Sequence, residues 1–141
     1  MGLVSCIHAG WWHEREWLVG KSDGHIRPSD PPRPDGLYGA AKVYMEALGR
    51  FASDVSGLPV SALRIGTMRA NMSLQELVDS DEMPHLGFGE RRAERRRRTW
   101  LTGDDLVDIL VEEFEAAEPY RLRYATSSPE QHQWDHTVYT G

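Results

Sequence analysis

The sequence predicts an α/β fold with parallel strand pairing. Short strand-like segments alternate with segments of helical periodicity, in the order strand, loop, helix, strand, loop, helix, strand. This alternation favours crossover connections, which join parallel strands. The length of 141 residues suits one domain, 1–141. Because so few segments have a strand pattern, we expect a thin sheet with one flank that lacks a neighbour.

The opening segment, 1–8, has the pattern of a short strand. The following region, 11–36, combines tryptophans with several prolines, and we expect a long Pro/Trp-rich loop there, since proline excludes regular helix and central strand. Its prolines are Pro28, Pro31, Pro32 and Pro34. Long loops inside compact domains are usually functional or disordered.

The segment 37–54 has the spacing of an amphipathic helix, with apolar residues three and four positions apart. Asp35 is a plausible N-cap, and Gly57 followed by Pro59 ends the helix. The segment 60–65 then predicts a buried strand, and a weaker helix is expected over 73–79.

The segment 83–98 is rich in Gly and Arg and is expected to be irregular at its start. Thr102 and Asp105 form a start that resembles a capping box, which predicts a helix over 104–117. Alternating residues over 120–125 predict a third strand. The polar tail, 126–141, is expected to be a loop.

Composition excludes several classes of protein. The apolar share of 40% argues against wholesale disorder, and no apolar run approaches the roughly 18 residues of a membrane span. The single cysteine, Cys6, cannot build a disulfide framework, so we expect a reducing cytoplasm. A net charge of -6 argues against nucleic-acid binding. His8, His13 and His25 have no metal-ligand spacing with Cys6, and we expect no metal site.

The pair Tyr38 and Lys42 is the sharpest chemical signal. A spacing of four places the phenol and the ammonium on one helix face, one turn apart. A nearby cation lowers the cost of a phenolate, which would let the tyrosine exchange a proton near neutral pH. The alternative is a tyrosine at the edge of the core beside a solvated lysine.

The residues around this pair match a known family. The chain resembles the extended short-chain dehydrogenase/reductases, the NAD-dependent epimerase/dehydratase family, over 3–135, and it is most similar to the uronate dehydrogenase branch. The matching motifs are Arg33-Pro-Asp-Gly-Leu-Tyr-Gly-Ala-Ala-Lys42, Gly57-Leu-Pro-Val60, Leu63-Arg-Ile-Gly-Thr67, Thr99-Trp-Leu-Thr-Gly-Asp-Asp-Leu106 and Tyr124-Ala-Thr-Ser-Ser128 with Trp134-Asp135.

The resemblance implies the C-terminal part of a Rossmann-type doubly wound parallel sheet. The family binds its dinucleotide on a Gly-rich loop after the first strand, and no such loop is found in this sequence. We therefore expect an N-terminally truncated, partial domain that lacks about 80 to 100 residues, the first strands among them. The implied cofactor is NAD or NADP, and the implied substrate is a sugar or sugar acid.

The resemblance also implies roles for single residues. Tyr38 would be the catalytic acid/base, and Lys42 would hold the nicotinamide ribose and lower the pKa of the phenol. The family's catalytic Ser or Thr matches Cys6, whose thiol is a weak hydrogen-bonding group, and Ser5 beside it is the alternative. Residues after the second strand would contact nicotinamide or substrate: Ile65 and Gly66 the cofactor, Thr67 the substrate.

The run 91–98 contains six arginines. In the uronate branch an arginine near this position meets the carboxylate of the sugar acid, and Arg95 is the nearest match. The alternatives are a solvated loop, or a nucleic-acid contact that no interleaved aromatic residue supports. Because of the missing loop and Cys6, a second hypothesis is an incomplete remnant or an interaction module, which self-associates or docks onto a separate N-terminal half.

Overall fold

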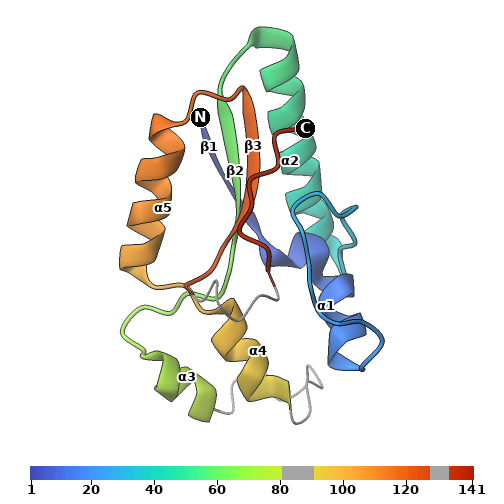
Figure 1. Cartoon of the computed structure of the whole chain (residues 1–141), viewed down its shortest axis with the longest axis vertical. Helices are drawn as coiled ribbons and strands as arrows, with labels where there is room; N and C mark the ends of the chain where they lie inside the picture. The colour runs from blue at the N-terminus through green and yellow to red at the C-terminus, as the bar shows by residue number, and fades with distance from the viewer. Residues whose placement is uncertain (81–90, 128–133) are drawn as a thin grey trace.

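The computed structural model describes residues 1–80, 91–127 and 134–141, and its centre is a parallel sheet. Three strands lie in the order β1 (Gly2–Cys6), β2 (Val60–Ile65) and β3 (Tyr120–Ala125) (Figure 1). Gly2 is in register with Ser61, and Val60 with Tyr120. The predicted α/β fold with parallel pairing is confirmed, and both later strands have the predicted bounds.

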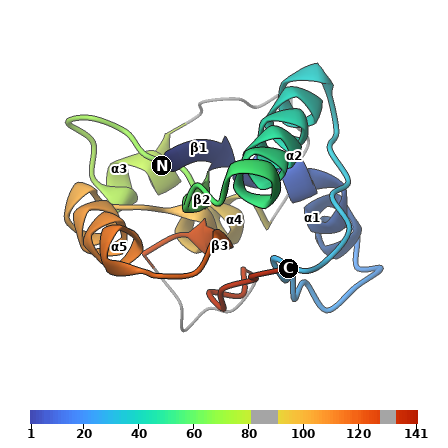
Figure 2. The same ribbon diagram turned by 90° about the horizontal axis from the view of Figure 1, so that it is seen from above.

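The two long helices, α2 (Leu37–Ser56) and α5 (Gly103–Glu115), cover opposite faces of the sheet (Figure 2). Side chains alternate along β2 accordingly: Arg64 bonds to Glu46 of α2, whereas Leu63 packs with Ile109 of α5. Because the strands follow one another in sheet order, helices on opposite faces give the two crossovers opposite hands. One of them therefore departs from the usual right-handed rule.

Helix α2 buries its small and polar side and exposes its apolar side. Gly39, Glu46, Gly49 and Ser53 face the sheet. The exposed side chains include Leu37, Tyr44, Leu48, Phe51 and Val55. The helix thus begins at the predicted residue and ends two residues later than predicted, and its apolar stripe points away from the core.

The ends of α2 are set by glycines. The N-cap is Gly36, without a side-chain cap, and the helix ends at Gly57, which has a left-handed backbone with φ of 67°. The prediction of Asp35 as the N-cap is wrong, because its carboxylate lies 3.6 Å from the His8 ring instead.

A buried polar network joins α2 to the sheet. The carboxylate of Glu46 accepts hydrogen bonds from Ser5 of β1 and from two nitrogens of Arg64, at 2.9 and 2.8 Å. Arg64 also donates to the hydroxyl of Tyr124, at 2.9 Å. One carboxylate therefore ties together side chains from α2, β1 and β2, and Arg64 extends the network to β3.

The region 11–36 is helical at its start, so the prediction of a loop throughout is wrong. A 3₁₀ turn, η1 (Ile7–Gly10), leads into α1 (Trp11–Leu18). Trp11, Glu14 and Trp17 are buried at three-residue spacing, but the charged residue between the tryptophans obscures the apolar pattern. From Val19 to Gly36 the chain has only an isolated bridge, Ile26 to Trp134.

Two short helices follow β2. Helix α3 (Leu74–Asp79) begins with a capping box between Ser73 and Glu76. Helix α4 (Arg92–Thr99) forms the later part of the Gly- and Arg-rich segment 83–98, and the start of that segment, 83–90, which was expected to be irregular, lies outside the described residues. Thr102 accepts a hydrogen bond from the backbone of Asp105, which confirms the predicted start of α5.

The tail contains no helix or strand within its described residues, but it is anchored. Trp134 is buried against Ile26 and Tyr124, and Tyr139 exchanges backbone hydrogen bonds with Leu122. Residues 128–133 of the predicted loop lie outside the described part. Within the described ranges, no helix has the length and apolar character needed to cross a bilayer.

Candidate active site

The candidate site lies where the carboxyl ends of the strands meet the amino end of α2. Cys6 ends β1, Ile65 ends β2, and Tyr38 and Lys42 occupy the first turns of α2. In open α/β sheets, ligands bind outside the carboxyl ends of the strands. The fold therefore brings Cys6, Ile65, Tyr38 and Lys42 to the carboxyl end of the sheet, where ligands are expected to bind.

Tyr38 and Lys42 are close neighbours. The Nζ atom of Lys42 lies 5.5 Å from the centroid of the Tyr38 ring and donates a hydrogen bond of 3.1 Å to the carbonyl of Val4. Tyr38 is 59% exposed, so this residue is open to solvent. The phenol and the ammonium group therefore lie on one face of the helix, as predicted.

Cys6 contacts the same phenol. Its thiol and the hydroxyl of Tyr38 share a hydrogen bond, and burial raises the pKa of the thiol. The pKa of Tyr38 is also raised, by desolvation and by the Cys6 thiol. Lys42 is not among the causes of this shift, so the expected lowering of the phenol's pKa by Lys42 is not seen in this chain.

Ser5 lies elsewhere. It is 2% exposed and donates to Glu46 in the network beneath α2. The prediction that Ser5 could replace the family's catalytic serine does not fit this arrangement, because its hydroxyl is already committed to a buried carboxylate. The structure brings Cys6 to Tyr38 instead.

His8 is a site residue that the sequence reasoning missed. Its ring stacks on Trp11, with centroids 4.5 Å apart, and meets the ring of Tyr38 edge-on at 5.8 Å. Burial lowers the pKa of His8, although Asp35 opposes this effect. A neutral imidazole therefore stands beside the candidate base. Its position two residues after Cys6, just past the end of the first strand, was the available signal.

The segment after β2 is fixed by backbone contacts. Gly66 donates to the carbonyl of Ala125, and Thr67 and Thr99 are joined by a backbone hydrogen bond and by their hydroxyls, 3.1 Å apart. A Cβ atom at Gly66 would collide with the carbonyl of Thr99, so glycine is required by close backbone approach. Ile65, Gly66 and Thr67 thus lie at the carboxyl end of β2 and just after it.

The arginine run packs against α1. Arg91 and Arg98 lie over the ring of Trp17, at 5.2 and 4.7 Å, and Arg95 lies over the ring of Trp11, at 4.4 Å. Their spacing of four and three places them on one side of α4. The interpretation of this run as a solvated loop is wrong, because most of it is helical and Arg91, Arg95 and Arg98 pack on buried tryptophans.

Arg95 is also held by an acid. Its Nε atom lies 2.8 Å from one carboxylate oxygen of Glu14, and an Nη atom lies 3.2 Å from the other. Glu14 is 0% exposed, and burial raises its pKa, although Arg95 opposes this effect. The predicted carboxylate-binding arginine thus already has a carboxylate partner within the chain.

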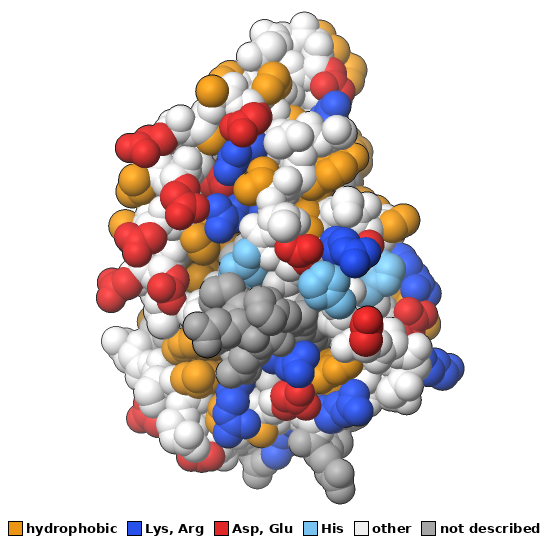
Figure 3. Space-filling model, in the orientation of Figure 1, with side chains coloured by type: hydrophobic (Ala, Val, Ile, Leu, Met, Phe, Trp, Pro, Cys, Tyr) orange, Lys and Arg blue, Asp and Glu red, His pale blue; other side chains and the backbone are white. Residues whose placement is uncertain are grey.

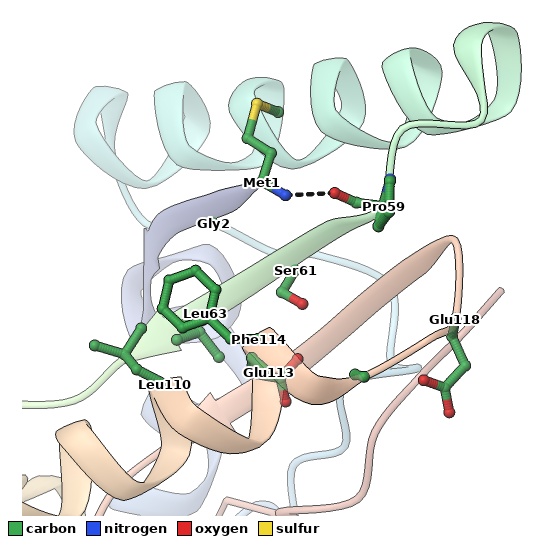
Figure 4. Close-up of a pocket in the computed structure, with 10 residues that line it drawn as sticks. Met1, Gly2, Pro59, Ser61, Leu63, Leu110, Glu113, Phe114 and Glu118 are labelled. Carbon is green, nitrogen blue, oxygen red and sulfur yellow. Dashed lines mark hydrogen bonds between the residues drawn. The ribbon is translucent and has the colours of Figure 1, made fainter.

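An apolar pocket of about 190 Å³ lies at the other end of the sheet, between the amino ends of β1 and β2 and helix α5 (Figure 4). There the amino terminus of Met1 donates to the carbonyl of Pro59. The pocket shares no residue with the candidate site. Among the described residues, no group of three His, Cys, Asp or Glu side chains is placed to hold a metal ion.

The chain is similar in sequence to known dehydrogenases of sugars and sugar acids. The chain is 37% identical over 91 residues to the L-arabinose 1-dehydrogenase (NAD(P)(+)) of Haloferax volcanii, covering 64% of this chain and 33% of that protein. It is 27% identical over 126 residues to the uronate dehydrogenase of Agrobacterium fabrum, covering 82% of this chain and 40% of that protein. No family model matches the chain.

The crystal structure of uronate dehydrogenase from Agrobacterium tumefaciens has a similar fold, with a TM-score of 0.61 and 24% identity, over 96% of this chain and 42% of that one. These findings confirm the resemblance to uronate dehydrogenase-like proteins. The chain spans between a third and about two fifths of the length of the curated relatives named here.

Proposed function

We propose that the chain supplies the proton-transfer site of an NAD(P)-dependent sugar dehydrogenase. One observation supports this proposal. Four side chains lie close together at the carboxyl end of a parallel sheet: Tyr38, Lys42, Cys6 and His8. The relative from Haloferax volcanii acts on a sugar, which agrees with this chemistry. We place the protein in the cytoplasm, because a chain with a single cysteine, Cys6, forms no internal disulfide and suits a reducing compartment.

Tyr38 acts as the acid/base. The sugar hydroxyl inserts between the phenol and the Cys6 thiol and replaces their hydrogen bond. The phenol first loses its proton to solvent, and the resulting phenolate takes the proton of the sugar hydroxyl. Removing the hydrogen bond to Cys6 removes one cause of the raised pKa of Tyr38, and Lys42 then favours the phenolate. His8 lies beside the phenol and can hydrogen-bond another hydroxyl of the sugar.

NAD(P), when bound, supplies the acceptor for the hydride of the sugar carbon. Lys42 would hold the nicotinamide ribose. The backbone of Ile65 and Gly66 would lie beside the nicotinamide ring, and Thr67 would contact the substrate. These residues fit only the nicotinamide end, because the sequence has no Gly-rich loop for the pyrophosphate. The chain thus offers a half-site for the cofactor.

Cofactor binding is tested by thermal unfolding of the chain with and without NAD⁺. Saturation at 100 times the dissociation constant should add about 2.7 kcal/mol to the free energy of unfolding. We expect the shift to disappear in Lys42→Ala and to persist in Lys21→Ala, a change in the other lysine of the chain. An equal shift in both variants would show that Lys42 does not hold the cofactor.

Catalysis is tested by sugar-dependent reduction of NAD⁺, with the chain alone and with a polypeptide that carries the Gly-rich half. Tyr38→Phe should lower turnover by about 100-fold or more, because it removes the proton acceptor. Tyr44→Phe, an exposed position on the same helix, is the matched control and should leave turnover unchanged. Full turnover in Tyr38→Phe would refute the mechanism.

A second candidate function is that of an interaction module, favoured by the open edge of β1. Among the described residues β1 pairs only with β2, and Val4 of this strand is 58% exposed. The partner we propose is a separate chain that carries the Gly-rich half and adds a strand to this edge. A compact monomer by light scattering, unchanged when that half is added, would count against it.

Nucleic acid is a poor candidate partner. Three arginines of the run, Arg91, Arg95 and Arg98, lie against Trp11, Trp17 and Glu14. Acidic side chains crowd the surface over α5 (Figure 3). An acidic surface of this kind is unfavourable for a nucleic-acid backbone, which supports a small molecule as the substrate.

A further inference from the structure

Glu14 and Arg95 form a buried ion pair beside the candidate site. We infer that the substrate is a neutral sugar, and that Glu14 excludes uronic acids by occupying the arginine that would bind their carboxylate. This inference rests on the proposed function and names its substrate class.

Glu14 uses the part of Arg95 that recognises carboxylates. One Nη atom of the guanidinium donates a hydrogen bond of 3.2 Å to one carboxylate oxygen of Glu14, and the Nε atom lies 2.8 Å from the other oxygen in an ion pair. Glu14 therefore occupies the side of the guanidinium that a substrate carboxylate would use. The ring of Trp11 covers one face of the guanidinium at 4.4 Å. Arg95 is only 8% exposed, so a second carboxylate has little access to it.

The arginine nevertheless lies at the candidate site. Trp11 separates Arg95 from His8, whose ring stacks on its other side and touches Tyr38 edge-on. The charge of Arg95 also acts on the Cys6 thiol. The position of Arg95 therefore agrees with the carboxylate-binding role that the resemblance implies. Its ion pair with Glu14 does not agree with that role.

The charges around the site balance. All lysines and arginines of the chain lie within the described ranges, and Lys42 and Arg95 are the cations that act on Cys6. Glu14 neutralises one of them, and Asp35 places a second carboxylate beside His8. A uronate would therefore enter a site with no surplus positive charge, and it would lose its hydration there.

The remaining groups suit hydroxyls. The imidazole of His8 and the hydroxyl of Tyr38 each donate and accept hydrogen bonds, and the carboxylate of Asp35 accepts them. A polyol can satisfy all three without bringing a charge. This is the chemistry of a neutral aldose.

The test compares D-galactose with D-galacturonate, which differ only at the sixth carbon. Titration calorimetry with the full 141-residue chain and saturating NAD⁺ should give tighter binding of galactose, by about tenfold or more. Equal or tighter binding of galacturonate would overturn the inference and leave the proposed function standing. Binding of neither sugar would refute both the inference and the proposed function. The NAD⁺-dependent shift in thermal unfolding would then show whether the chain still binds the cofactor.

The variant Glu14→Gln tests the cause. It keeps the shape of the side chain but removes its charge, so the preference for galactose over galacturonate should fall by about tenfold. Glu16→Gln, a change in an acid of the same helix that pairs with Arg33, is the control and should keep the wild-type preference. An unchanged preference in folded Glu14→Gln would overturn the role of Glu14, and if this variant does not fold, the comparison of the two sugars on the wild-type chain still decides the inference.

Discussion

Glu46 and Arg64 are single residues on which the core depends. Both are nearly buried, at 6% and 2% exposure, and they meet through two hydrogen bonds. Removing one partner of a buried pair leaves the other charge without compensation, whereas removing both costs less. The pair therefore forms a unit that single substitutions break.

We expect Arg64→Met to lower the free energy of unfolding by about 3–5 kcal/mol in urea denaturation. The double variant Arg64→Met with Glu46→Leu should recover part of this loss. Arg50→Met, which breaks an exposed pair with Asp54, is the control and should cost no more than about 1 kcal/mol. A loss at Arg64 no larger than that control would contradict the argument.

Glu113 makes stability depend on pH. Burial alone would raise the pKa of this carboxyl, but hydrogen bonds from Arg121, Ser61 and Arg123 hold it below its ordinary value of 4.5. A group with a depressed pKa stabilises the fold above its unfolded pKa, and this contribution is lost as the pH falls through the folded value. Acid should therefore weaken the contact between α5 and β3.

The expected result is a steeper acid loss of stability in the wild type than in Glu113→Gln, between about pH 6 and pH 3. Urea midpoints across this range provide the measurement. Glu115→Gln, at the end of the same helix, is a suitable control. Parallel pH curves for wild type and Glu113→Gln would contradict this assignment.

The sequence could predict Tyr38 and Lys42, because their meaning depends on a spacing within one helix. It could not predict Glu14, which acquires its role from Arg95, 81 positions away. Nor could it decide between Ser5 and Cys6, since that depends on which of two neighbours meets the carboxylate of Glu46. Contacts between distant elements determine the rest of the site.

At the scale of elements, glycine sets how closely α2 lies on the sheet. A Cβ atom at Gly49 would collide with the side chain of Leu3 and come within 3.1 Å of Val60. Although alanine is the better helix former, we expect Gly49→Ala to destabilise the chain by about 1–3 kcal/mol. Gly103→Ala, where a Cβ atom meets nothing within 4 Å, is the control in thermal unfolding. A stabilised Gly49→Ala would show that the contact relaxes freely.

Sequence patterns predicted the later strands and α2 correctly, because proline, glycine and alternation mark their ends. Helix α1 was missed because Glu14 is a charge on its buried side, and α4 because its buried positions include Arg95 and Arg96. The apolar period that signals a helix is absent where ion pairs and cation–π contacts replace apolar packing.

At the scale of the whole molecule, the alternation of elements predicted parallel strands but not the faces of the helices. The right-handed rule places consecutive crossover helices on one face of such a sheet. Here α3 and α4 extend the connection between β2 and β3, and α5 returns on the face opposite α2 (Figure 2). The packing of Leu63 on Ile109 places α5 on this face of the sheet. This contact joins distant positions of the chain, so it could not be read from the order of the elements.

The register of the sheet has a consequence for how the chain folds. Gly2 pairs with Ser61 and Val60 pairs with Tyr120, so each strand must find a neighbour about 60 positions away. No local hairpin can start such a sheet, and the closure of long loops has to precede its first contacts. The 20-residue helix α2 can form early, whereas the strands assemble late and together. Refolding should therefore be slower than that of a helical protein of the same length, and the site, which needs β1, β2 and α2 in place, should be among the last parts to form.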